Sequence, residues 1–286
     1  MNKWNDSNCD HSIYLFIYLF IYLFIANHKT HRMKLIRKIG LVIISIIILI
    51  LLISTGDKSK KIISKIEDEF PNILNYEINT KESQLDFYFK NENGKRFRNH
   101  RNLKKWLAKR NQKLLFAMNG GMYNKDLNPQ GLYIENGNKI TAIDRKKNGY
   151  GNFYMKPNGI LYITNDNQAQ IKTTIEFIAN DSIKYATQSG PMLITKGKIH
   201  PKFNEGSKNI HIRNGVGLLP NGNLLFAMSK KKINFYDFAT FFKQNKCENA
   251  LYLDGFVSKT YLPSKNWIEE DGNFGVIIGQ IKKMIN

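Results

Sequence analysis

Seven Asn-Gly pairs divide most of the chain, and they constrain its fold more than any other feature. Both residues tolerate the positive φ that a tight hairpin turn requires, and apolar runs flank several of the pairs. The sequence therefore predicts repeated strand–turn–strand units. The clearest units join 153–155 to 160–163 across Asn158-Gly159, 216–219 to 224–228 across Asn221-Gly222, and 192–194 to Ile199 across Lys196-Gly197.

Two stretches have helical spacing instead. Residues 99–112 place Leu103, Trp106 and Leu107 on one face, and residues 235–244 place three phenylalanines on one face. The second stretch leads directly into an apolar strand at 250–253. Strands predominate over helices, so we expect an α+β fold: a mixed or antiparallel, hairpin-rich sheet with a few packed helices.

The first 56 residues do not resemble a globular domain. Residues 13–25 repeat Tyr-Leu-Phe-Ile, and we interpret 1–32 as a low-complexity, non-native extension with the biological start at Met33. Basic residues at 34–38 followed by an apolar run at 39–53 predict a signal peptide or signal anchor at 33–56. A stalk helix at 57–75 and one domain at 76–286 complete the expected organisation.

Charge and topology bear on location and partners. The positive-inside bias places the domain outside the cytoplasm of a bacterial cell, tethered to the cell membrane by the single N-terminal helix, or secreted or periplasmic if the signal is cleaved. The formal charge of +20 suits anionic partners. Its basic runs at 145–147 and 230–232 are short and scattered beside turns, so we expect no nucleic-acid partner.

Four segments share a pattern: an apolar strand that ends in glycine together with a polar side chain. The first ends in Asn119-Gly120-Gly121, where backbone N–H groups and an amide meet without bulk. The second contains Ser189-Gly190, which we interpret as a shaping turn or ligand contact because no nucleophile elbow surrounds the serine. Both are candidate substrate-binding segments.

The other two segments carry charge. On a strand, His211 and Arg213 would share a face, and a guanidinium suits bidentate contact with phosphate. They are followed by Asn214-Gly215. Asp254 ends the last apolar strand, where enzymes place an acid, base or nucleophile, and is followed by Gly255 and Ser258. We predict Asp254, Arg213 and His211 as catalytic residues, and Asn214, Gly255 and Ser258 as substrate-binding residues.

The sequence gives little indication of a metal or a cofactor. The chain has no Walker motif, no dinucleotide fingerprint, no His-Glu-x-x-His and no structural zinc spacing. Asp254, Asn119 and Asn214 offer oxygen atoms of the kind that Ca²⁺ binds, but they belong to no dedicated loop. We therefore predict no metal ligands and name Ca²⁺ as the one ion that these oxygens suit.

Read in order, the segments resemble the phosphodiester glycosidase family, the family of the lysosomal uncovering enzyme, and within it an uncharacterised bacterial exported branch. The resemblance spans roughly 85–278. The matching stretches are FAMNGGMY (116–123), NPQGLYIENG (128–137), GNFYMKPNGI (151–160), YATQSGPMLITKGKIHPKF (185–203), IRNGVG (212–217), NFYDFA (234–239) and NALYLDGFVSKTYLP (249–263).

The resemblance implies a hydrolase that removes a sugar, typically N-acetylglucosamine, which is joined through its anomeric carbon to a phosphodiester. By resemblance, residues 119–121, 189–191, Arg213 and 254–255 correspond to the site residues of the family. Many members have a second glycine where this chain has Phe256, which bears on sugar specificity. Two alternatives stay open: a non-catalytic module that binds anionic envelope glycans, and a phosphodiesterase that cuts P–O bonds.

Overall fold

The computed structural model describes residues 40–41, 43–45, 68–254 and 257–284. The chain divides into two compact units, Met1–Lys65 and Ile66–Asn286. Of the first unit, 40–41 and 43–45 are helical. The predicted extension, the rest of the signal segment and most of the stalk helix lie outside the described residues. Among the residues that are described, no helix is long and apolar enough to cross a membrane.

The second unit contains three sheets, and every pairing between its described strands is antiparallel. The first sheet has the order β1 (Ile73–Ile78), β12 (Leu224–Ser229), β11 (Asn214–Leu218), β13 (Asn249–Asp254), β9 (Met192–Thr195), β10 (Lys198–Ile199). The second has the order β15 (Trp267–Ile268), β14 (Thr260–Leu262), β3 (Gln112–Asn119), β16 (Ile277–Lys283), β2 (Gln84–Tyr88). The third has the order β5 (Asn138–Thr141), β4 (Tyr133–Glu135), β8 (Ile183–Ser189), β6 (Gly159–Thr164), β7 (Ala169–Thr173).

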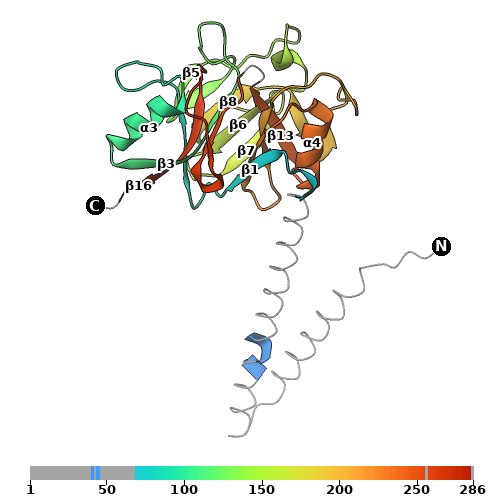
Figure 1. The fold of residues 1–286 in the computed structure, drawn as a ribbon, viewed down its shortest axis with the longest axis horizontal. Coiled ribbons are helices and arrows are strands. Elements are labelled where there is room, and N and C mark those ends of the chain that lie inside the picture. Colours follow the sequence, from blue (N-terminus) through green and yellow to red (C-terminus); the bar gives the residue numbers. More distant parts are fainter. Residues whose placement is uncertain (1–39, 42, 46–67, 255–256, 285–286) are drawn as a thin grey trace, which may run out of the picture. The chain divides into compact units, whose positions relative to one another are not determined.

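Two helices flank the sheets (Figure 1). Asn99 caps α3 (His100–Ala108) by accepting from the backbone of Asn102, and Asn234 caps α4 (Phe235–Gln244) in the same way. Phe238, Phe241 and Phe242 bury one face of α4 against the first sheet. Two short 3₁₀ helices, η1 (Asn152–Tyr154) and η2 (Pro263–Lys265), complete the unit. Both predicted helices are confirmed, the first with an earlier end.

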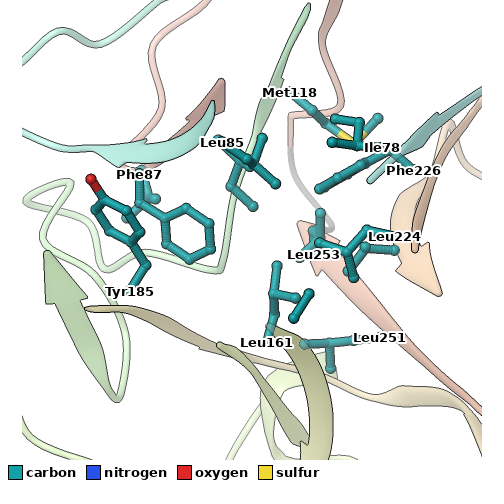
Figure 2. Packing of buried hydrophobic residues seen from close by; sticks show 14 of the residues in the cluster. Ile78, Leu85, Phe87, Met118, Leu161, Tyr185, Leu224, Phe226, Leu251 and Leu253 are labelled. Atoms are coloured by element: carbon teal, nitrogen blue, oxygen red, sulfur yellow. The ribbon is translucent and has the colours of Figure 1, made fainter. Parts of the chain in front are cut away.

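All three sheets contribute to one central core, which Figure 2 shows in close-up. Leu251 and Leu253 enter it from the first sheet, Phe87 and Met118 from the second, and Leu161 from the third. Each of these side chains is at most 1% exposed. The expectation of a single sheet is therefore corrected to three sheets packed on a shared interior, which fixes the strand ends of different sheets relative to one another.

The hairpin predictions have mixed outcomes. The β11–β12 hairpin across Asn221-Gly222 and the β9–β10 hairpin across Lys196-Gly197 are confirmed. The hairpin across Asn158-Gly159 is wrong, because 152–154 form η1 and β6 pairs with β7 and β8 instead. In addition, β1 begins at Ile73, inside the segment predicted as a stalk helix.

Stability is expected to fall as pH drops from 7 to 5, because α3 begins at a buried histidine. His100 is 0% exposed, and burial lowers its pKa from 6.5 to about 4. Its Nδ1 lies 2.8 Å from the Glu269 carbonyl oxygen, which requires an N–H there and fits the neutral ring. Because the folded-state pKa is the lower one, the unfolded chain takes up the proton first, and stability is lost as pH falls through 6.5 towards 4. The loss at pH 5 is about 2 kcal/mol.

Urea denaturation of the full-length chain at several pH values measures this loss. His100→Gln retains a donor for the Glu269 carbonyl but does not titrate, so its stability should change less between pH 7 and 5. Some slope should persist, because burial also lowers the pKa of His200. An unchanged slope in His100→Gln would contradict the assignment.

Candidate active site

Four strand ends from the three sheets meet where the sequence places its glycine-flanked polar residues. Asn119 ends β3, Asn214 begins β11, Asp254 ends β13 and Ser189 ends β8. The Asn119 Nδ2 donates to Asp254 Oδ2 at 2.9 Å, and the Asn214 Nδ2 donates to Asn119 Oδ1 at 2.9 Å. Ser189 adjoins this cluster because its hydroxyl donates to the Leu253 carbonyl at 2.6 Å. The structure thus brings together segments up to 135 residues apart in sequence.

A bulge positions the carboxylate. Asn214 pairs with Asp254 and Gly215 with Tyr252, so Leu253 is the extra residue on β13. Bulges of this kind re-aim side chains and occur often beside active sites. Here the bulge places Asp254 opposite Asn214, and the Asp254 N–H donates to Asn214 Oδ1 at 3.1 Å.

Backbone donors fix the orientation of both amides. The Lys259 N–H donates to Asn119 Oδ1 at 2.8 Å, and the Asp254 N–H donates to Asn214 Oδ1. Because a backbone N–H requires an oxygen opposite it, each amide must present its NH₂ group elsewhere. For Asn119, this directs the NH₂ group to Asp254 Oδ2 and to the Val257 carbonyl. The cluster therefore holds the carboxylate in one orientation.

The same orientation bears on the Ca²⁺ expectation. The side-chain oxygens of Asn119 and Asn214 face N–H donors and do not converge with Asp254 into an oxygen cage. Within the described part of the chain, no three His, Cys, Asp or Glu side chains group as metal ligands do.

The site is buried: Asn119, Asn214 and Asp254 are 1%, 0% and 3% exposed. Charges interact strongly in such surroundings. Burial, and secondarily the negative charge of Asp254, raise the pKa of Tyr123. Tyr123 had no role in the sequence-based prediction. Its place two residues after Gly121, in the first of the four segments, is the signal that could have identified it.

Arg213 does not occupy the position expected of a phosphate clamp. It is 1% exposed, and its guanidinium stacks 3.5 Å from the centre of the Phe235 ring. Its Nε donates to the Ile233 carbonyl, Nη2 to the Asn209 carbonyl and side chain, and Nη1 to the Tyr252 hydroxyl. The guanidinium thus joins the 209–213 segment to α4 and β13 from inside the fold.

The expected pairing of His211 with Arg213 on one strand face is wrong. The strand β11 begins at Asn214, whereas His211 makes only an isolated bridge to Ile233. His211 is exposed and Arg213 is buried. Regular alternation therefore does not extend back to these two residues, and their side chains are in different environments.

The glycines of the candidate segments let the backbone lie close to neighbouring strands and loops around the site. A Cβ at Gly121 would collide with the Thr187 side chain and lie 2.7 Å from the Gln188 carbonyl, so the turn after β3 can lie against β8 only with glycine. A Cβ at Gly120 would lie 2.8 Å from Val276, and one at Gly190 2.7 Å from Asn158.

Of the remaining predicted residues, one lies beyond the cluster and one is not among the residues that the structure describes. Ser258 donates from its hydroxyl to the Ile212 carbonyl at 3.3 Å, joining the segment after Asp254 to the one before β11. Gly255 lies outside the described residues.

Comparison with known proteins gives a family. The phosphodiester glycosidase (NAGPA) family matches residues 112–276, more than half of the chain. The uncharacterized protein YigE of Escherichia coli (strain K12) is 36% identical over 188 residues, covering 65% of this chain and 73% of YigE. The solved catalytic domain of zebrafish N-acetylglucosamine-1-phosphodiester alpha-N-acetylglucosaminidase, auto-inhibited by its pro-peptide, shares the fold with a TM-score of 0.50 at 16% identity, over 73% of this chain and 81% of that one. The chain belongs to the phosphodiester glycosidase family.

Proposed function

We propose that the protein is a hydrolase of sugar 1-phosphodiesters that cleaves the glycosidic C–O bond. The observation that carries the proposal is the buried Asp254 carboxylate at a point where strands of separate sheets end: the Asn119 amide donates to it, and Asn214 accepts from the Asp254 backbone N–H. Family membership supports a glycosidase-type reaction, and the name of the zebrafish relative gives the substrate class, a sugar joined through C1 to a phosphodiester.

The chemistry of this substrate suits a single carboxylate. Cleavage of an anomeric C–O bond passes through an oxocarbenium-like state, for which most glycosidases use two carboxylic groups. A phosphate monoester leaves as a stable anion and needs little protonation. Asp254 then acts as the base that takes a proton from the attacking water, or as the nucleophile at C1. The Asn119 amide donates to Asp254 Oδ2 and so keeps the carboxylate in one orientation for either role.

The clamp role predicted for Arg213 is not part of this proposal. Its guanidinium donates to protein acceptors in the interior, and these bonds stabilise the segment that precedes Asn214. Its contribution to the reaction is therefore indirect, through the position of β11.

The direct test is an assay of the purified full-length chain on a panel of sugar 1-phosphodiesters, with reducing sugar as the product measured. We expect release of sugar from at least one member, with N-acetylglucosamine and glucose as the first sugars to try. The alternative, a non-catalytic module for anionic envelope glycans, predicts glycan binding that survives Asp254→Ala and no reducing sugar from any substrate. That pair of results would overturn the proposal.

A further inference from the structure

A hollow of about 550 Å³ on the second unit is lined by cations and no acids. Its lining residues are Lys90, Gly94, Lys95, Arg96, Arg98 and Asn102. The described residues contain six ion pairs, which engage Lys and Arg side chains elsewhere, and none involves these four cations. In the part of the chain that the structure describes, no carboxylate therefore lies within ion-pair distance of these four cations.

Two of these cations lie so close together that their repulsion destabilises the fold. Lys90 and Arg96 oppose each other in an isolated antiparallel bridge, and both lie over the Phe89 ring, at 5.0 and 5.6 Å from its centre. Like charges directly opposite on paired strands destabilise the pairing. Arg96 is anchored by a 2.8 Å bond from Nη2 to Asn128, while its buried Nε has no hydrogen-bond partner among the described residues. An oxyanion in the hollow would relieve the repulsion between Lys90 and Arg96, and a guanidinium suits phosphate in particular.

A second, smaller pocket of about 240 Å³ adjoins the hollow, because Lys90 lines both. Its lining contains two acids, Asp86 and Glu135, and two lysines, Lys90 and Lys184, so its formal charges are equal in number. The other lining groups are amides, among them Asn136, and aromatic rings, among them Trp106. Tyr185 also lines the pocket; its hydroxyl points away from the core side chains in Figure 2 and donates to Asn136 at 2.6 Å. Balanced charge, amides and rings suit a neutral polyhydroxylated ring, and the volume lies below the roughly 300–1,000 Å³ of drug-sized sites.

Neither pocket belongs to the Asp254 cluster. The small pocket is lined by Gln112 at the start of β3 and by Lys184 near the start of β8. Asn119 and Ser189 end the same two strands, and a strand of this length spans roughly 23 Å. On the side of the hollow, Arg96 donates to Asn128, which lies in the loop that leaves Gly121.

We propose that the two pockets form an accessory, non-catalytic site for one phosphorylated sugar unit. The phosphate lies among Lys90, Lys95 and Arg96, and the sugar ring lies against Asn136 and Trp106. The site would hold another unit of the same chemical class as the substrate, and to that extent the inference rests on the proposed function. A nucleic acid or a bare anionic surface would use the cations but leave the polar pocket empty.

Calorimetric titration of the full-length chain at 0.15 M ionic strength tests the site, with glucose 6-phosphate, glucose and inorganic phosphate as separate probes. Glucose 6-phosphate should bind at least tenfold more tightly than either of the other two. The double variant Lys90→Gln/Lys95→Gln should weaken its binding about tenfold, equivalent to roughly 1.4 kcal/mol. The matched control Lys231→Gln/Lys232→Gln removes two exposed charges elsewhere and should leave binding unchanged.

A second pair of variants tests the sugar pocket. Asn136 has a φ of 50°, so Asn136→Gly deletes the amide without straining the turn, and Asn266, at φ 54°, offers the same change away from both pockets. Asn136→Gly should weaken binding of glucose 6-phosphate and not of inorganic phosphate, whereas Asn266→Gly should affect neither.

Equal losses in the two double-lysine variants, or glucose 6-phosphate binding no tighter than phosphate, would overturn the inference and assign the effect to overall charge. Binding retained in Asp254→Asn separates this site from the catalytic one. Because binding is measured without turnover, a chain that binds glucose 6-phosphate but hydrolyses nothing would overturn the proposed function alone.

Discussion

Replacing Asp254 with asparagine is expected to reduce turnover of a sugar 1-phosphodiester by roughly 10²–10⁴-fold, the usual contribution of a positioned general base, with the fold intact. Asparagine has nearly the same size, and its oxygen can still accept from the Asn119 amide, which donates to Asp254 at 2.9 Å. The substitution also removes a buried charge, so unfolding should not become easier. The measurement is kcat together with the urea midpoint for both chains.

Asp144→Asn is the matched control. Asp144 accepts from the Tyr154 hydroxyl at 2.7 Å, outside the Asp254 cluster, and its replacement should leave kcat within about twofold. Near-full activity of Asp254→Asn would remove this carboxylate from the reaction. Equal losses in the two variants would attribute the effect to general disturbance of the fold.

Arg213→Lys is expected to lower the free energy of unfolding by roughly 3 kcal/mol, because an ammonium cannot reproduce the planar fork of a guanidinium. Arg213 donates to the Ile233 and Asn209 carbonyls at 2.9 Å each, and both acceptors lie around a side chain that is 1% exposed. Leaving such acceptors unpaired costs about 1–3 kcal/mol each. Urea denaturation measures the change as a shift of midpoint at constant slope.

Arg110→Lys provides the comparison for that variant. Arg110 is surface-exposed, lies 3.9 Å from the centre of the Trp106 ring and pairs with Glu92, so its replacement should cost no more than about 1 kcal/mol. A stable Arg213→Lys chain with a raised KM would instead restore the phosphate-clamp role that the sequence suggested.

Local signals predicted the elements whose determinants are contiguous in sequence. The helix at 235–244 was predicted with its observed bounds because a capping asparagine precedes it and three phenylalanines share one face. The hairpin at Asn221-Gly222 was predicted because both residues tolerate positive φ, and in the structure Gly222 adopts it, with a φ of 85°. The segments ending at Asn119, Ser189 and Asp254 were recognised from the same kind of local pattern.

The remaining features depend on tertiary contacts that no local pattern encodes. Asn-Gly forms a hairpin turn at Asn221, but at Asn119 and Asn214 it places an amide at the end of a strand, where its partners are up to 140 residues distant. The irregular segment before Asn214 breaks the alternation from which a shared face of His211 and Arg213 was inferred, and the bulge at Leu253 is likewise not visible in the local pattern. The meeting of three sheets in one core is likewise a property of packing and not of any segment.

The central claim is that water attacks the sugar and not the phosphorus. The measurement that tests it most directly is hydrolysis of a sugar 1-phosphodiester by the full-length chain in ¹⁸O-labelled water, followed by mass spectrometry of both products before the free sugar exchanges. We expect the label in the sugar hydroxyl at C1 and an unlabelled phosphate monoester. Label in the phosphate would mean P–O cleavage and would contradict the account.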